Sequence, residues 1–169
     1  MRDMLISDTC VILDFCVINQ LALLRRLDLR IVIPEDLLVD ELSDWEKSIR
    51  SLGFALDSLS GNEMQKFFLP LMSQYQNSGL SYYDVLVLTL AKVRRTTLLT
   101  GDLRLRKAAV EQQVSLKGTI FLLEQLVIQK VLSVEASLAL LEKMQKAGSR
   151  LPWSLAREMV LKAAKNNKA

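Results

Sequence analysis

Two kinds of apolar pattern alternate along the chain: short continuous runs, and longer stretches in which apolar side chains recur every three or four residues. Residues 4–7 and 29–33 are short runs, and we expect each to form a buried strand. Between them, residues 9–27 have helical spacing and predict a helix. A proline closes the second run, and a helix over residues 35–45, which carries Glu41, is expected to follow it.

Residues 51–60 are ambiguous and fit either a loop or an extra strand. Directly after them, Ser60 and Glu63 have the spacing of a capping box, in which each side chain bonds the backbone of the other residue. This pattern predicts the start of a helix. Because proline lacks an N–H and clashes with the preceding turn, Pro70 should kink or shorten that helix.

The stretch at residues 80–106 places a helix, a strand and two carboxylates close together in sequence. Ser81 precedes Asp84 by three residues, which predicts a helix start, and the apolar face that follows is too wide for a surface helix. Residues 96–100 are short, apolar and β-branched, and they predict a strand that ends before Asp102. We therefore expect a buried helix followed by a strand with a carboxylate at its carboxyl end.

The remainder of the chain continues the alternation and then becomes helical. Residues 103–111 predict a helix, 114–116 a short strand and 120–131 another helix. Two amphipathic helices at 133–146 and 154–165 follow without a further strand. Alternating strands and helices indicate right-handed βαβ units around a parallel sheet. The sequence thus predicts an α/β fold with a helical tail.

The composition suits one folded domain. The chain has 169 residues, of which 50% are hydrophobic. No apolar run approaches the roughly 18 to 20 residues of a membrane span, so we expect a cytoplasmic protein without membrane contact. Cys10 and Cys16 are six positions apart, which fits neither a disulfide framework nor a CxxC site, and we interpret them as small buried hydrophobes.

The charged residues are unevenly distributed, and histidine is missing from the sequence. Without histidine, His-based zinc sites and Ser-His-Asp or Cys-His nucleophile systems are excluded, so any hydrolysis must use carboxylates, a metal or both. Residues 1–91 hold 7 Lys and Arg against 13 Asp and Glu, whereas residues 92–169 hold 15 against 6. This asymmetry fits an acidic crevice beside a polyanion track, two solvated surfaces, or an oligomer interface.

Four carboxylates are the candidate chemical groups. Asp8 and Asp102 each follow a predicted strand, and ligand sites of parallel sheets lie beyond the carboxyl ends of the strands. Asp84 and Glu41 lie on helices that can reach the same edge. Each residue also has an ordinary structural explanation: the aspartates suit helix caps or first turns, and a helical glutamate is usually solvated. Both interpretations stay open for each residue taken singly.

Convergence of these carboxylates on one crevice would require a cation, because their charges repel each other. Oxygen ligands without His or Cys favour Mg²⁺ or Mn²⁺, and such ions promote in-line displacement at phosphodiesters. Arg104, Arg106 and Lys107 come directly after Asp102, where they are candidates for binding substrate phosphates. A solvated helix face explains these cations equally well.

Five sequence segments together resemble the PIN-domain family over about residues 4–132: SDTCVIL, IPEDLLVDEL, LSYYDVLVLTLA, LLTGDLRLRKAA and VSLKGTIFLLEQL. The resemblance implies a three-layer α/β/α sandwich with a short central parallel sheet. Residues 1–132 would form this PIN-like domain, and residues 133–169 a helical extension packed on it. The resemblance also implies metal-binding acidic positions, with Thr100 orienting their ligands or a metal-bound water. Those acidic positions are occupied here by Asp8, Glu41, Asp84 and Asp102.

The function implied by the resemblance is a Mg²⁺- or Mn²⁺-dependent endoribonuclease whose products carry a 5′-phosphate and a 3′-hydroxyl. Small PIN domains are commonly the toxins of toxin-antitoxin pairs, so the implied partners are RNA, an antitoxin protein and a second copy in a homodimer. The tail, GSRLPWSLAREMVLKAA, resembles a helical extension found in a subset of small PIN-like proteins. Exposed apolar positions on the tail helices either bind such a partner or close the core.

Two positions depart from the family pattern. Cys10 stands where many members have Ser, Thr or Asn, so we expect a polar contact near Asp8 to be missing. Arg106 stands where some members have an acidic or amide residue, which would reduce the site to one tightly held metal. Two alternative functions remain: a non-catalytic module that binds RNA or protein, and a structure-specific DNA nuclease.

Overall fold

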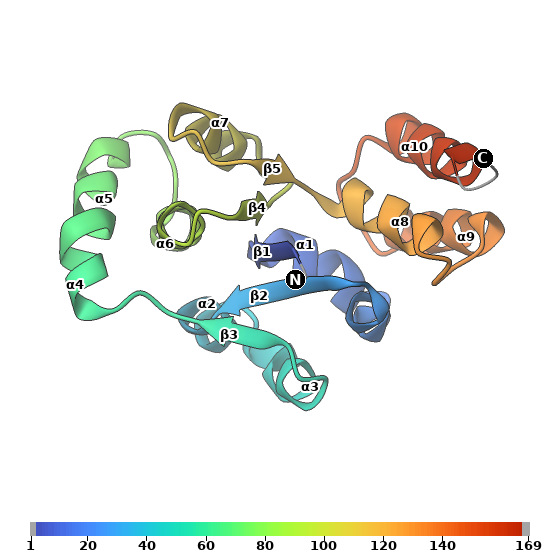
Figure 1. Ribbon diagram of the computed structural model, residues 1–169, viewed down its shortest axis with the longest axis horizontal. Helices are drawn as coiled ribbons and strands as arrows, with labels where there is room; N and C mark the ends of the chain where they lie inside the picture. Colours follow the sequence, from blue (N-terminus) through green and yellow to red (C-terminus); the bar gives the residue numbers. More distant parts are fainter. Residues whose placement is uncertain (1–2, 167–169) are drawn as a thin grey trace.

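A parallel sheet forms the centre of the protein. In residues 3–166, the part that the computed structural model describes, five strands pair in parallel in the order β3-β2-β1-β4-β5 (Figure 1). The strands are β1 (Asp3–Ser7), β2 (Leu29–Pro34), β3 (Ala55–Asp57), β4 (Thr97–Leu99) and β5 (Leu116–Lys117). The ambiguous residues 51–60 therefore contain an edge strand, β3, in their middle.

Neighbouring side chains of each central strand point into two different cores. Leu5 of β1 belongs to one apolar cluster and Ile6 to the other, and Leu99 and Leu98 of β4 divide in the same way. Burial of each such side chain contributes about 1.5–3 kcal/mol, and burial on both faces requires a layer of helices on each side. The predicted three-layer α/β/α fold with a parallel sheet is confirmed.

The first helical layer covers the face of Leu5 and Leu99. It contains α1 (Thr9–Cys16), η1 (Leu21–Arg26), α2 (Glu35–Asp40), α3 (Glu46–Ser51), α8 (Thr119–Ile128), α9 (Val134–Lys146) and α10 (Trp153–Asn166). The second layer contains η3 (Met64–Phe68), α5 (Leu69–Tyr75), α6 (Tyr82–Val93) and α7 (Leu103–Glu111). Two short segments, η2 (Ser43–Trp45) and α4 (Gly61–Glu63), connect these elements.

The chain leaves β1 and β4 in opposite directions. After β1 it passes through α1 to β2 on one side, and after β4 it passes through α7 to β5 on the other. Ser7 and Leu99 are paired at the carboxyl ends of these two adjacent strands. Diverging connections at neighbouring strands open a crevice outside their carboxyl ends. Asp8 and Asp102 follow β1 and β4 at this point.

Two predicted helices are shorter than expected. The helix predicted over 9–27 ends at Cys16, because Asn19 adopts a left-handed conformation with φ 54°, which asparagine tolerates better than most residues. The chain resumes as the 3₁₀ helix η1. The helix predicted over 35–45 ends at Asp40, because the amides of Glu41 and Leu42 both bond the Leu37 carbonyl and close the last turn. Glu41 is consequently the C-cap residue.

The capping signals and the proline act as predicted. Ser60 and Glu63 form a capping box at the start of α4, and Ser81 and Asp84 form a second one at the start of α6. Pro70 lies in the first turn of α5, and the segment before it, η3, is a π-helix with wider turns. Proline cannot donate the backbone hydrogen bond of a regular α-helix, and its ring clashes with the carbonyl four residues earlier. The wider π-turns before Pro70 accommodate both effects.

The tail helices share the first core. Leu140, Met144, Ala156 and Val160 of α9 and α10 are buried in the same cluster as Leu5 of β1. Figure 1 shows α8, α9 and α10 gathered at one end of the molecule. These tail side chains close the core. Within residues 3–166, no helix combines the length and the hydropathy needed to span a bilayer.

Candidate functional site

Asp8 is the most buried of the candidate carboxylates. It follows β1 and caps α1, where its Oδ1 accepts a hydrogen bond from the Thr9 amide at 2.7 Å. Its Oδ2 accepts from the Thr100 hydroxyl at 2.9 Å and from the Cys10 thiol at 3.1 Å. Burial raises the pKa of Asp8, and the charge of Asp84 adds to that shift, while these hydrogen bonds oppose it. The fold thus holds a carboxylate where its charge is poorly solvated.

Asp102 is joined to Asp8 through Thr100. The Thr100 hydroxyl, which donates to Asp8, accepts a hydrogen bond from the Asp102 amide at 3.1 Å. Asp102 is exposed and caps α7, with its Oδ1 accepting from the Leu105 amide at 2.8 Å. One buried hydroxyl therefore fixes the spacing between the residues that follow β1 and β4.

Asp84 lies in the first turn of α6. Its Oδ2 accepts a hydrogen bond from the Ser81 amide at 2.7 Å, and its own amide donates to the Ser81 hydroxyl at 3.1 Å. This capping box orients the carboxylate at the helix N-terminus. The charge of Asp84 contributes to the raised pKa of Asp8, so the two carboxylates interact electrostatically.

Glu41 is joined to the crevice through Thr9. The Thr9 hydroxyl donates a hydrogen bond to Glu41 Oε2. Beside Glu41, Asp40 accepts a hydrogen bond from the Tyr83 hydroxyl at 2.6 Å, and this bond raises the pKa of Tyr83 to about 12. Tyr83 precedes Asp84, so the end of α2 and the start of α6 are tied together next to the carboxylates.

Hydrogen bonds link Asp8 to Asp102 through Thr100, and the neighbouring Thr9 to Glu41, while the charge of Asp84 raises the pKa of Asp8. The aspartates also have the helix-capping roles that structure alone would give them. None of the ion pairs described for residues 3–166 involves any of the four. Each of Asp84, Asp102 and Glu41 uses one oxygen in the bonds above, which leaves its second oxygen for a cation. Oxygen donors with uncompensated charge fit Mg²⁺ or Mn²⁺. Among the described residues, however, no three His, Cys, Asp or Glu side chains are grouped as a preformed metal site.

Cys10 corrects an expectation from the sequence. We expected a polar contact near Asp8 to be missing, but the thiol at the second position of α1 donates to Asp8 Oδ2 and accepts from the Gly101 amide at 3.3 Å. Burial, followed by the charge of Asp8, raises the pKa of this thiol to about 12. Cys10 therefore supplies a neutral S–H donor in place of a hydroxyl or amide.

The cations after Asp102 have different surroundings. Arg104 Nη1 donates to the Gly79 carbonyl at 3.2 Å, and Arg106 Nη1 donates to the Thr100 carbonyl at 3.0 Å. Arg106 thereby holds the backbone at Thr100, the residue after β4 whose hydroxyl connects Asp8 and Asp102. Lys107 is exposed on α7. Each guanidinium retains further N–H donors, so these contacts leave room for phosphate binding.

Sequence reasoning overlooked two contributors to the crevice, Thr9 and Tyr83. Thr9 follows Asp8 in sequence, and its hydroxyl reaches Glu41, 32 positions away. Tyr83 precedes Asp84 and bonds Asp40. Their adjacency to candidate carboxylates was the available signal, but only the folded arrangement of α2 beside α6 gives the two hydroxyls their partners.

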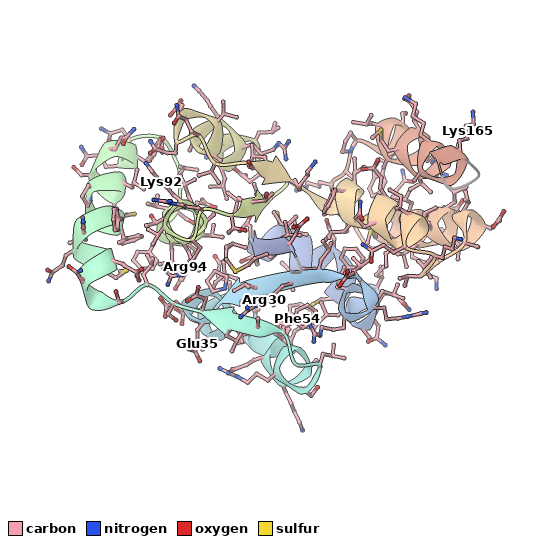
Figure 2. The ribbon with its side chains drawn as sticks, in the orientation of Figure 1. Arg30, Glu35, Phe54, Lys92, Arg94 and Lys165 are labelled. Carbon is pink, nitrogen blue, oxygen red and sulfur yellow. The ribbon has the colours of Figure 1, made fainter. Side chains whose placement is uncertain are left out.

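Two cavities lie at opposite ends of the strands. The smaller, about 370 Å³, adjoins Asp102 at the carboxyl ends. The larger, about 840 Å³, lies at the amino ends of β1, β2 and β4, away from the four carboxylates. Arg30, Lys92 and Arg94, labelled in Figure 2, line the larger cavity, and Arg94 is paired with Asp57 and Glu63 at 2.7 and 2.6 Å.

Comparison with known families gives one match. A family model described as a PIN domain matches residues 4–165. The match extends past residue 132 and includes the tail helices α9 and most of α10. Comparisons with curated proteins and with solved structures gave no match.

Proposed function

The chain belongs to the PIN-domain family, and from that premise we propose that it is a metal-dependent endoribonuclease. PIN domains are generally metal-dependent nucleases. The observation that supports the proposal most directly is the buried Asp8 carboxylate, whose pKa the charge of Asp84 helps to raise and which one hydroxyl joins to the Asp102 backbone. Repulsion between the carboxylates destabilises the fold, and a bound cation would offset it.

In this proposal, Asp8, Asp84 and Asp102 hold a Mg²⁺ or Mn²⁺ ion, and Glu41 completes the site or accepts a proton from the attacking water. The cation would supply positive charge for activation of that water and for the phosphoryl oxygens. Thr100 and Cys10 donate to Asp8 Oδ2 and orient its carboxylate. Thr9 positions Glu41 in the same way. Arg104, Arg106 and Lys107 would bind substrate phosphates.

The direct test is cleavage of single-stranded and structured RNA by the purified protein with Mn²⁺. We expect products with a 5′-phosphate and a 3′-hydroxyl, and loss of cleavage in EDTA. Asp8→Asn and Asp102→Asn should reduce cleavage to background. Glu142→Gln, an exposed carboxylate of α9, is the matched control and should retain full activity. Equal cleavage by all four proteins would exclude the proposed site.

A second candidate function is a non-catalytic RNA-binding module. It is favoured by the helix-capping roles of Asp8, Asp84 and Asp102 and by the lack of a preformed group of three ligands in residues 3–166. It predicts RNA retention that weakens with salt and is unaffected by EDTA. Retention without cleavage in Mn²⁺ would support this function over the nuclease.

Substrate and partner are tested separately. Cleavage of flap or single-stranded DNA in preference to RNA would reassign the chain to structure-specific DNA nucleases. A toxin role additionally requires growth arrest on expression and relief by the product of a neighbouring gene. A homodimer would be detected from the mass of the purified protein in solution.

A further inference from the structure

The smaller cavity lies directly beside the candidate metal site, and three segments far apart in sequence form its wall. These segments are α1, the turn after β4 that contains Gly101 and Asp102, and residues 147–151, the loop between α9 and α10. The tail therefore contributes directly to the surroundings of Asp102, in addition to closing the core. A volume of about 370 Å³ falls in the range of roughly 300–1,000 Å³ that small-molecule sites occupy.

The loop that completes the wall is held in place by its own contacts. Gly148 has φ +90°, a left-handed conformation that glycine adopts without strain, and it ends α9. The Ser149 amide then bonds the Met144 carbonyl at 3.0 Å. Asp14 of α1, whose pKa burial raises and the Ser149 side chain lowers, accepts a hydrogen bond at Oδ2 from the Thr119 hydroxyl at 2.6 Å. Contacts to α1, α8 and α9 thus form the pocket before any ligand arrives.

The lining has the chemistry of a base-binding pocket. Leu13 of α1, its C-cap residue Val17 and Leu151 of the loop give an apolar wall, and Val17 is 47% exposed. Arg150 is an exposed cation on the same loop. Unpaired nucleobases are recognised by apolar or guanidinium surfaces against the ring, together with polar groups at the ring edge. Asp14 supplies such a polar group, an acceptor for an amino group.

We propose that this pocket binds the base of the nucleotide next to the scissile phosphate, with Arg150 against the ring and Asp14 accepting a hydrogen bond from an exocyclic amino group. The position next to the scissile phosphate rests on the nuclease function proposed above, whereas base binding itself does not. Cytosine carries the amino group and uracil has a carbonyl in its place. The pocket therefore prefers cytidine over uridine, by about 10-fold for one hydrogen bond to a carboxyl acceptor.

The test uses mononucleotides, which have no internucleotide bond to cleave. Protein with ¹³C-labelled Leu and Val methyl groups is titrated in EDTA with cytidine 5′-monophosphate and, separately, with uridine 5′-monophosphate. We expect the methyl resonances of Leu13, Val17 and Leu151 to shift, while Leu155 and Leu161, exposed on α10 outside the pocket, stay unchanged. Uridine monophosphate should require about 10-fold more ligand.

Substitutions then assign the contacts. Arg150→Ala should weaken binding of both nucleotides, whereas Arg157→Ala, which removes a cation of α10 outside the pocket, should leave it unchanged. Equal affinity for the two nucleotides, unchanged binding by Arg150→Ala, or shifts confined to other methyl groups would overturn the proposal.

The same data separate this proposal from the nuclease function. If the protein shows the expected shifts but leaves RNA intact with Mn²⁺, the base-binding pocket is supported and the nuclease function is contradicted. If the protein cleaves RNA but the three methyl probes do not shift, the nuclease function is supported and the base-binding pocket is contradicted.

Discussion

The hydroxyl of Thr100 donates a hydrogen bond to Asp8 Oδ2 at 2.9 Å, across 92 positions of sequence. The Thr100 hydroxyl oxygen also accepts a hydrogen bond from the Asp102 amide. Thr100→Val keeps the shape and removes both bonds. We expect it to lower Mn²⁺ affinity or activity by about 10–100-fold, as for other residues that orient metal ligands. Isothermal titration with Mn²⁺ measures the affinity, and Thr100→Ser should restore it.

A control for this substitution lies in α6. Thr89 is also fully buried, and its hydroxyl donates to the Val85 carbonyl at 2.7 Å. Thr89→Val makes the same chemical change outside the crevice, so it should leave Mn²⁺ affinity unchanged. If both variants lost affinity equally, the effect of Thr100 would be one of general stability.

The raised pKa of Asp8 gives a prediction for stability in EDTA. A folded-state pKa above the unfolded value favours the protonated carboxyl, so this contribution to stability is present below the unfolded pKa and lost as pH rises through the folded one. At neutral pH the metal-free fold therefore holds an unfavourable charge. Asp8→Asn, which still caps α1, should unfold at higher urea concentration than the wild type at pH 7, with the difference shrinking toward low pH.

Adding Mn²⁺ should reverse that order. Ligands that bind only the folded state stabilise it, so Mn²⁺ should raise the unfolding midpoint of the wild type and leave Asp8→Asn unchanged. A variant less stable than the wild type at pH 7 in EDTA would contradict the interpretation of Asp8 as an uncompensated buried charge.

The two capping boxes allow another matched comparison. Ser81→Ala and Ser60→Ala each remove an N-cap hydroxyl, and each should lower the free energy of unfolding by about 1 kcal/mol. Only Ser81 shares its box with a crevice carboxylate, Asp84. We therefore expect Ser81→Ala alone to weaken Mn²⁺ binding as well, which urea unfolding and metal titration together would show.

The cysteines should be unreactive in the folded protein. Burial raises the pKa of the Cys10 thiol to about 12 and that of Cys16 to about 11. Because the thiolate is the nucleophile, alkylation by iodoacetamide at pH 8 should be slow in buffer and fast in urea, as measured from the intact mass. Rapid labelling of Cys10 in the folded state would show that its contact with Asp8 is open.

Local chemistry made much of the fold predictable. Four of the five strands were expected near their observed positions, and the boxes at Ser60 and Ser81 mark the starts of α4 and α6. The misplaced helix ends depend on features without a strong sequence signal. The left-handed turn at Asn19 and the closing bonds to the Leu37 carbonyl are two such features. These are stabilised by surrounding packing, which a periodic pattern does not report.

The positions of Asp8 and Asp102 beyond the ends of adjacent strands were predictable from the sequence, whereas the hydrogen bonds around them were not. The rule for parallel sheets placed Asp8 and Asp102 at one edge. It did not indicate that Thr9 reaches Glu41, or that Cys10 serves as a donor to Asp8. Such links depend on side-chain directions at loop ends. The pocket beside Asp102 was not predictable from the sequence either, because part of its lining comes from residues 147–151, which are remote in sequence.

Because β1 pairs with β4, the candidate site can form only after both strands have been translated. Thr100 is translated 92 codons after its partner Asp8, and residues 147–151 follow later still. A growing chain shorter than this contains the first carboxylate without the strand that orients it. Any capacity to cut RNA would therefore begin only after the segment that ends at residue 151 has been translated and folded.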